Sequence, residues 1–196
     1  WRRAVQAYHA TISFADAQIG RVLDALEHSA HANNTIVVLW GDHGWHLGEK
    51  EHWRKHALWE VSTRTPLIFS APAGVAKGHL CPRPVSLIDI YPTLIDLCGL
   101  PEQKSLDGQS LRPLLEEPDR KWERPVLMTH GRNNHAVRTE RWRFIQYGDG
   151  GQELYDHAKD PNEWTNLASS PEHSALKSKL AKWLPAINVK PRRERR

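Results

Sequence analysis

An acidic residue and a histidine stand side by side between two glycines, directly after a run of residues that predicts a β-strand. The run is "TIVVLW" (35–40), and Gly41, Asp42, His43 and Gly44 follow it. A carboxylate oxygen and a neutral imidazole nitrogen can together bind a divalent cation, and the glycines allow a sharp turn with room for a ligand. Two side chains do not complete a metal site, so further ligands must come from elsewhere. The alternative is a local turn in which Asp42 caps a backbone N–H.

Cationic side chains crowd the segment after this turn. Lys55 lies thirteen residues beyond Asp42, with His46, His52 and His56 around it. Cationic hydrogen-bond donors beside a metal suit a tetrahedral anion such as sulfate or phosphate, and any of the three imidazoles could protonate a leaving group. Taken singly, each histidine fits a surface or packing role equally well, so the choice among them stays open.

The elements around this segment predict an α/β fold. One helix is expected over residues 3–30, with an apolar stripe at three- and four-residue steps, and Asn33-Asn34 end it. The runs "TIVVLW" and "TPLIFSAP" (65–72) are short, continuous and apolar, which is typical of strands covered on both faces in a parallel sheet. Ligands bind such sheets at the carboxyl ends of the strands, where Asp42 and His43 stand.

The second half of the chain has a different pattern of predicted elements, with two short helices followed by short strand-like runs. A helix is predicted to open at Asp89 as N-cap, with Pro92 in its first turn and Gly99 ending it. Residues 107–115 predict a turn and a short helix, and the charged stretch 116–124 marks a boundary. Beyond it, short strand-like runs separated by turn sequences predict an antiparallel meander. These runs are 125–130, 135–139, 142–147 and 152–156.

A final helix is predicted at about 171–184, packed on that meander by the apolar side chains of Leu176, Leu180, Trp183 and Leu184. The fold expected from these elements is α/β, with a partial mixed sheet flanked by helices over residues 1–120. A small antiparallel sheet subdomain with a C-terminal helix follows over 121–190, and a basic tail over 191–196.

Composition narrows the classes of function. The 196 residues have a net charge of +4, and basic residues are interleaved with acidic ones except in the tail "KPRRERR", which argues against a nucleic-acid binder. No apolar run approaches the roughly 20 residues that span a bilayer. The two cysteines are expected to be buried free thiols. Trp45, Trp53 and Trp59, among nine tryptophans, are expected to form structural walls or to line a substrate cleft.

The chain also resembles a known family. The stretch from "YHATISFADAQIGRVLDALEHSAHANNTIVVLW" through "GDHGWHLGEKEHWRKHALWEVSTRTPLIFSAP" is similar to the C-terminal half of the type I sulfatases, in the alkaline phosphatase superfamily. The pattern is nearest to the iduronate-2-sulfatase and choline-sulfatase-like branch. "LIDIYPTLIDLCGLP", "LDGQSLRPLL" and "ELYDHAKDPNEWTNLA" match later stretches of the family, so the resemblance covers nearly the whole chain.

The resemblance implies roles for three residues. Asp42 and His43 correspond to the second pair of metal ligands, usually for calcium, and Lys55 to the lysine that contacts the sulfate group and the leaving oxygen. The family's nucleophile is a formylglycine made from Cys or Ser in a C/S-x-P/A-x-R motif. Cys81 in "CPRPV" and Cys98 in "CGLPE" both fail this motif, and the first Asp-Asp metal pair is missing. Because the chain also begins without Met or a signal-peptide pattern, we expect a fragment whose nucleophile and remaining ligands lie upstream.

The expected function is therefore hydrolysis of sulfate monoesters of a small molecule or carbohydrate, with this chain alone inactive. In "GRNNHAVRT", Arg132, His135 and Arg138 are candidates for recognising an acidic sugar, the alternative being solvated charges at strand ends, Arg138 and Arg141 among them. A phosphoester or phosphonate hydrolase of the same superfamily and a non-catalytic fragment are the other readings. The family resemblance implies a periplasmic, secreted or lysosomal-like location, for which the chain itself carries no signal.

Overall fold

The structure is a computed structural model that describes residues 1–189, so the predicted basic tail lies outside the described residues. The helices are α1 (Arg2–Glu27), α2 (Glu60–Thr63), α3 (Ile90–Leu97), α4 (Arg112–Glu116) and α5 (Ser174–Ala181), with single 3-10 turns at η1 (Glu49–Glu51), η2 (Leu87–Asp89) and η3 (Pro171–His173). The strands are β1 (Val37–Trp40), β2 (His46–Leu47), β3 (Trp53–Arg54), β4 (Leu67–Ser70), β5 (Val126–Thr129), β6 (His135–Arg138), β7 (Trp142–Gln146) and β8 (Gln152–Asp156).

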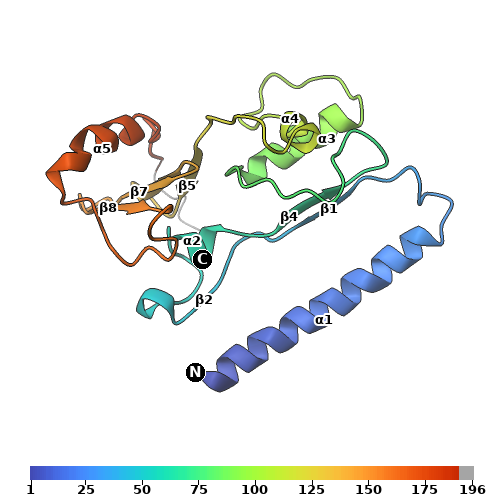
Figure 1. Ribbon diagram of the computed structural model, residues 1–196, viewed down its shortest axis with the longest axis horizontal. Coiled ribbons are helices and arrows are strands. Elements are labelled where there is room, and N and C mark those ends of the chain that lie inside the picture. The colour runs from blue at the N-terminus through green and yellow to red at the C-terminus, as the bar shows by residue number, and fades with distance from the viewer. Residues whose placement is uncertain (190–196) are drawn as a thin grey trace.

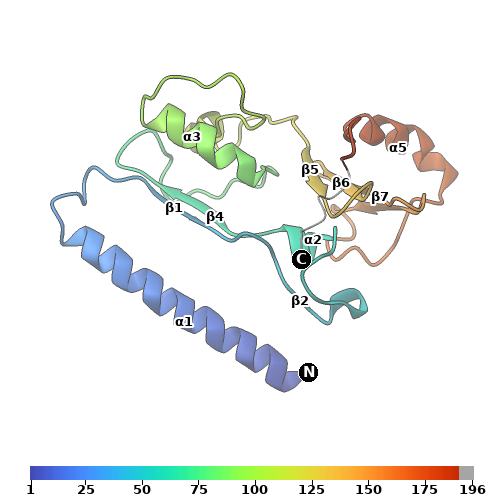
Figure 2. The ribbon, with the colours of Figure 1, turned by 180° about the vertical axis from the view of Figure 1, so that it is seen from behind.

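Strands β1 and β4 form the layer from which the candidate metal ligands emerge. They run between α1 on one side and α3 and α4 on the other (Figures 1 and 2), which confirms the α/β class. The two strands pair antiparallel, with Val37 opposite Ser70 and Trp40 opposite Leu67. The expectation of a parallel arrangement is therefore wrong for this pair. The chain turns back between residues 41 and 66, and Trp40 and Ile68 are 51% and 55% exposed.

The predicted long helix is present as α1, but its apolar stripe packs on little of the described chain. No residue of α1 is buried, and Val22 remains 69% exposed. Contacts form at its first turns, where Trp1 Nε1 donates to the Leu47 carbonyl at 2.8 Å and the Tyr8 ring stacks near Trp45 at 6.3 Å. The N-terminal end of α1 is thereby fixed beside the segment that carries the candidate site.

The helix expected from Asp89 begins one turn earlier than the sequence predicted. Ser86 starts the 3-10 turn η2 in a capping box, in which its N–H donates to Asp89 Oδ2 at 3.0 Å. Asp89 is thus not the N-cap of α3 by its side chain, because its other oxygen pairs with Arg124 at 2.6 Å. Gly99 ends the helix with φ of +64°, as predicted, because glycine adopts this conformation without strain.

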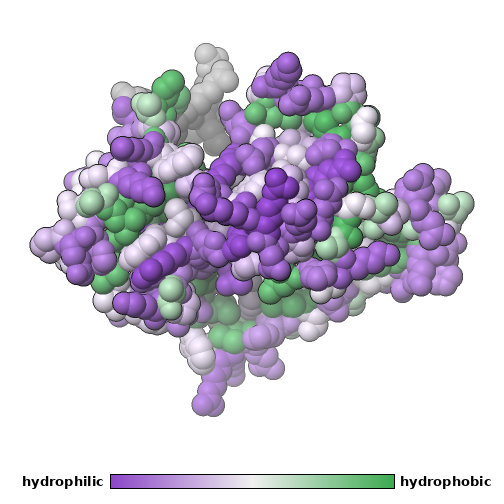
Figure 3. Space-filling view, turned by 45° about the horizontal axis from the view of Figure 1, so that its top comes forward, coloured by the Kyte–Doolittle hydropathy of each residue, from purple (hydrophilic) through white to green (hydrophobic). Residues whose placement is uncertain are grey.

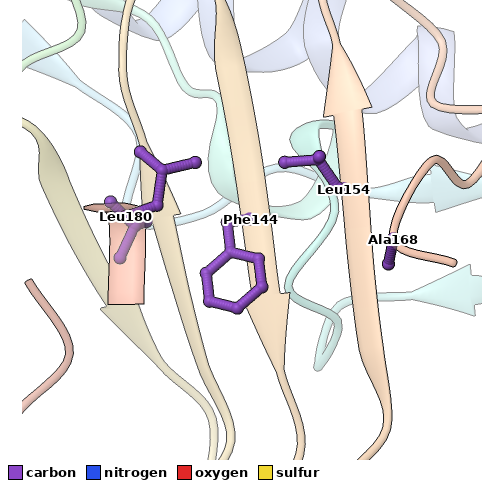
Figure 4. Close-up of a cluster of buried hydrophobic side chains, with 5 residues drawn as sticks. Phe144, Leu154, Ala168 and Leu180 are labelled. Atoms are coloured by element: carbon purple, nitrogen blue, oxygen red, sulfur yellow. The ribbon is translucent and has the colours of Figure 1, made fainter. Parts of the chain in front are cut away.

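The four predicted C-terminal runs form one antiparallel sheet in the order β5-β6-β7-β8, which confirms the meander. Alternate side chains point to opposite faces, and one face packs under α5. There Val137, Phe144 and Leu154 are fully buried against Leu180 and Ala168 (Figure 4). Leu176 and Leu184 pack at the edge of this cluster, as predicted. Trp183 does not, being 51% exposed, because α5 ends at Ala181 and the helical period stops there.

The opposite face of this sheet positions the candidate site. Ala136, Ile145 and Tyr155 form a second buried cluster with Leu58, which follows directly on the segment that carries Lys55. Arg138 and Arg143 share this face because each lies two residues from a member of the cluster. The sheet is thus joined to the β1–β4 layer through residues 58–60.

The surface of the described chain is mixed in character. On the face shown in Figure 3, hydrophilic residues predominate and hydrophobic ones lie in separate patches. Among residues 1–189, no helix combines the length and the apolar character needed to cross a membrane. Cys81 and Cys98 are free thiols, as predicted, but neither is buried: Cys81 is partly exposed and Cys98 is exposed. The predicted boundary near residue 120 stays a prediction.

Candidate active site

The turn after β1 is held by backbone hydrogen bonds to the segment before β4. The Gly41 N–H donates to the Pro66 carbonyl at 3.1 Å, and the Gly44 N–H to the Ser62 carbonyl at 2.8 Å. A Cβ on Gly44 would lie 1.9 Å from the Val61 carbonyl oxygen, so this position requires glycine. Close backbone approach therefore fixes both ends of the turn that carries Asp42 and His43.

Asp42 and His43 present one oxygen and one nitrogen acceptor to the same point. The His43 Nδ1 lies 2.8 Å from the Gly44 carbonyl and donates to it, which leaves the lone pair on Nε2. Asp42 Oδ2 lies 3.4 Å from that Nε2, and the Asp42 side chain is 81% exposed while that of His43 is 29% exposed. A backbone carbonyl that fixes the tautomer of a histidine in this way is typical of metal-ligating imidazoles.

Lys55 joins the pair from the neighbouring segment. Its Nζ lies 2.9 Å from His43 Nε2 and donates to the free lone pair. The structure therefore brings the three residues singled out by spacing and resemblance, Asp42, His43 and Lys55, to one place. An ammonium beside two potential metal ligands favours binding of an anion at the same point.

The segment that carries Lys55 has a strained backbone. Lys50, Glu51, Arg54 and His56 have φ between +55° and +72°, although none is glycine. Such conformations cost on the order of 1 kcal/mol or more each and persist only where surrounding contacts fix them. The path of this segment must therefore be set by tertiary contacts.

Glu163 supplies several of these contacts. It is 1% exposed, and its carboxylate accepts hydrogen bonds from the Glu60 N–H at 2.8 Å and from His157 Nε2 at 2.9 Å. Arg143 Nε lies 2.6 Å from the same carboxylate, an ionic contact rather than an aligned hydrogen bond. The backbone carbonyl oxygen of Glu163 accepts a hydrogen bond from Lys50 Nζ, which also donates to the Tyr155 hydroxyl at 3.1 Å. One buried residue thus holds both flanks of the Lys55 segment.

Glu60 extends this network into the antiparallel sheet. Its carboxylate pairs with both Arg138 and Arg143, and Arg143 Nη1 also donates to the Leu58 carbonyl at 2.7 Å. Burial alone would raise the pKa of Glu60, but the two guanidinium groups outweigh it and lower the pKa to about 2. Glu60 is therefore ionised at neutral pH and paired with two cations, the buried Arg143 and the partly exposed Arg138.

Glu60, His157 and Glu163 have side-chain atoms close enough together to hold a metal ion. The same carboxylates, however, are engaged by Arg138 and Arg143, whose positive charges balance them. A cation would have to displace these pairs, so the group is an ionic junction between the sheet and the Lys55 segment. This junction could not be recognised from sequence, because Glu163 stands in the polar run "DPNEWTN" and Arg143 in a strand-like run.

The three histidines near Lys55 have different surroundings. His46 is fully buried, its Nε2 has no hydrogen-bond partner among residues 1–189, and burial lowers its pKa. His52 Nε2 bonds to the Lys55 carbonyl at 3.0 Å. His56 is exposed and lines a groove of about 1330 Å³ together with Asp42, His43 and Lys55. Of the three, only His56 shares the groove with the candidate site.

Of the residues expected to recognise substrate, Arg138 lines the groove, and His135 and Arg132 lie elsewhere. His135 is 5% exposed, with Nδ1 bonded to Thr129 Oγ1 at 2.8 Å and Nε2 to Asn188 Oδ1 at 2.6 Å, so both ring nitrogens are engaged. Arg132 is exposed and, like His135, does not line the groove. Their part in recognition stays a prediction without geometric support.

The charges at the strand ends also differ from a purely solvated pair. Arg138 is 15% exposed and paired with Glu60, so it is not a solvated charge at a strand end, which was the alternative to a role in substrate recognition. Arg141 is 52% exposed and bonds to both oxygens of Asp156, which places it nearer to that description. Among the tryptophans, Trp59 lines a hollow beside the groove, while Trp53 is 43% exposed.

Comparison with known proteins identifies the family. Residues 48–190 match the family described as "N-sulphoglucosamine sulphohydrolase, C-terminal". The chain belongs to this sulfatase family. It is also 44% identical over 189 residues to a sulfatase of Formosa agariphila, covering 96% of this chain and 37% of that protein. The chain thus spans little more than a third of its relative's length.

Two solved structures show the same sulfatase fold. The structure of BT4656 in complex with its substrate D-glucosamine-2-N,6-O-disulfate is 28% identical, with a TM-score of 0.75 over 88% of this chain and 38% of that one. A phosphonate monoester hydrolase of Agrobacterium radiobacter is 27% identical, with a TM-score of 0.78 over 89% and 39%. The comparisons establish the family without distinguishing its iduronate-2-sulfatase or choline-sulfatase-like branch.

Proposed function

We propose that the complete protein hydrolyses sulfate monoesters and that its substrate is a sulfated carbohydrate. The observation that supports this most strongly is the 2.9 Å contact between Lys55 Nζ and His43 Nε2, which sets a cation against the Asp42–His43 acceptor pair in a chain of the sulfatase family. The similarity to BT4656, whose substrate is a sulfated glucosamine, supports a sugar as the alcohol part.

The Asp42–His43 pair fits two positions of a divalent-cation site. Asp42 offers an exposed carboxylate, and His43 is held in the tautomer whose Nε2 can accept. Calcium is the ion we propose, since the resemblance to type I sulfatases implies it; when bound, calcium supplies positive charge that polarises a sulfate oxygen. Because calcium takes 6–8 ligands, residues outside this pair must complete the site.

Lys55 is assigned to charge stabilisation. When His43 Nε2 serves as a ligand, the Lys55 ammonium loses that acceptor, and its three N–H groups can donate to an anion. The negative charge that develops on the sulfate group and the leaving oxygen is then offset by a fixed cation. The nucleophile is proposed to be a formylglycine outside residues 1–196, because neither Cys81 nor Cys98 lies in the maturation motif.

A phosphonate or phosphate monoester hydrolase is the second candidate, because the Agrobacterium radiobacter enzyme shares the fold over most of this chain. The test is to measure kcat/KM of the complete protein for 4-nitrophenyl sulfate, D-glucosamine-2-N,6-O-disulfate and a phenyl phosphonate monoester. We expect both sulfate esters to be cleaved with higher kcat/KM than the phosphonate. The reverse order would favour the second candidate, and no turnover of any ester would favour a non-catalytic protein.

A further inference from the structure

A small hollow lies beside the groove of the candidate site. It has a volume of about 260 Å³, and its polar and aromatic lining comes from His52, His56, Trp59, His130, Asn134 and Tyr147. His56 and His130 line both the hollow and the groove that contains Asp42, His43 and Lys55. The two spaces are therefore adjacent, so one molecule can occupy both.

The lining offers aromatic surface and uncommitted imidazoles. Trp59 Nε1 and the Tyr147 hydroxyl both donate to Glu153, at 2.7 and 3.0 Å, and burial raises the pKa of Tyr147, so that its hydroxyl stays protonated. These two rings therefore contribute carbon surface to the hollow. The His56 and His130 rings lie 5.4 Å apart, and no hydrogen bond within residues 1–189 engages either imidazole.

The backbone at both imidazoles is fixed. The His130 N–H donates to the Asn134 carbonyl, and the Asn134 side-chain amide donates to the His130 carbonyl, both at 3.0 Å. Asn134 Oδ1 in turn accepts from the Gly148 N–H at 3.0 Å. His56 has φ of +72°, an unfavourable conformation for a non-glycine residue. The hollow is thus preorganised, with two exposed imidazoles on rigid supports.

We infer that this hollow binds the sugar ring of the substrate, with His130 as a specificity-determining residue; the inference rests on the proposed function. Aromatic carbon surface beside hydrogen-bonding imidazoles suits a polyhydroxylated ring whose sulfate lies at Lys55. A quaternary ammonium such as choline would instead call for a cage of several aromatic faces, and the hollow has only two aromatic rings besides its imidazoles. The site therefore favours a sulfated sugar over choline sulfate.

Two variants of the complete protein test this. His130→Phe keeps a planar ring without its hydrogen-bonding nitrogens, and His130→Gln keeps a donor and an acceptor. Losing a hydrogen bond to a substrate hydroxyl costs roughly a factor of ten to a hundred. For D-glucosamine-2-N,6-O-disulfate, we expect kcat/KM to fall by about that factor in His130→Phe and by less in His130→Gln. For 4-nitrophenyl sulfate, which has no sugar ring, kcat/KM should change by less than about twofold.

His28→Phe is the matched control, because His28 is likewise an exposed histidine and lines neither the hollow nor the groove; it should leave kcat/KM for both substrates unchanged. An equal loss for both substrates in His130→Phe, or no loss for the sugar, would overturn the inference. If the wild-type protein cleaves neither ester, the proposed function has failed separately. Calorimetric binding of the sulfated glucosamine to the wild type and to His130→Phe then tests whether the hollow is a sugar site. Binding that His130→Phe abolishes would support the hollow as a sugar site, and equal or absent binding would reject it.

Discussion

Glu163→Gln in the complete protein should release the Lys55 segment without unfolding the chain. The substitution keeps the shape of the side chain and removes the charge that faces Arg143, in a pair whose members are 1% and 2% exposed. Removing one partner of a buried ion pair costs about 3–5 kcal/mol. Arg143 keeps Glu60 and the Leu58 carbonyl as partners. We therefore expect the free energy of unfolding to fall by about 3 kcal/mol, the low end of this range. A loss of about 3 kcal/mol lowers the melting temperature of a domain of 150–250 residues by roughly 6–12 °C, and the longer complete protein should show a smaller fall.

Limited trypsin digestion reports the position of the segment directly, because Lys50, Arg54 and Lys55 are cleavage sites within it. Loss of the hydrogen bond that the Glu60 N–H donates to the Glu163 carboxylate should speed cleavage at these sites well below the melting temperature. Turnover should fall as well, because Lys55 is no longer held against His43. The digestion itself does not depend on any enzymatic activity.

Asp156→Asn is the matched control for Glu163→Gln. Asp156, at the end of β8 in the same sheet, is 3% exposed and accepts hydrogen bonds from Arg141, and none of its hydrogen bonds among residues 1–189 reaches the Lys55 segment. This variant should lose stability without faster cleavage between residues 50 and 55. If the two variants are cleaved at these sites at the same rate once matched for fraction folded, Glu163 has only a general stabilising role and the reasoning is refuted.

Three further outcomes are expected. Lys55→Ala should lower turnover about a hundredfold, the effect of about 3 kcal/mol in the transition state, with the melting temperature unchanged; a lower melting temperature with normal turnover would make Lys55 structural. The pKa of Glu60 falls from 4.5 to about 2 on folding, so the stability it contributes, on the order of 3 kcal/mol, is complete above pH 4.5 and lost as the pH falls toward 2. Urea titrations at pH 5 and pH 3 should show this loss in the wild type and a smaller one in Glu60→Gln. Residues 1–196 expressed alone should hydrolyse no aryl sulfate above background, and metal-dependent turnover by the purified monomer would contradict the proposed location of the nucleophile.

Local patterns were sufficient for much of the fold. The C-terminal runs are short and strand-like and are separated by short turn sequences, and the sheet β5–β8 forms from them as predicted. The short, continuous apolar run before Gly41 likewise predicted β1. The direction in which β1 and β4 pair could not be predicted, because it depends on the path of residues 41–66 rather than on the composition of either strand.

The convergence of Asp42, His43 and Lys55 followed from their place after a strand and from the family resemblance. The network that supports them could not be predicted. Arg143 alternates with apolar neighbours in β7, which for a sheet with one solvated face predicts an exposed side chain. It is buried because Leu58, 85 residues earlier, covers that face. His135 similarly looked accessible beside Asn134, but pairing of β6 with β5 turns its ring toward Thr129.

The central claim, that Asp42 and His43 hold a metal ion at a sulfatase active site, is tested most directly by one paired measurement on Asp42→Ala in the complete protein. Calcium content by elemental analysis and turnover of 4-nitrophenyl sulfate should be measured on the same folded sample. We predict that both fall together while the melting temperature in the absence of calcium is preserved, because the Asp42 side chain is 81% exposed. Wild-type calcium content and turnover in this variant would contradict the account.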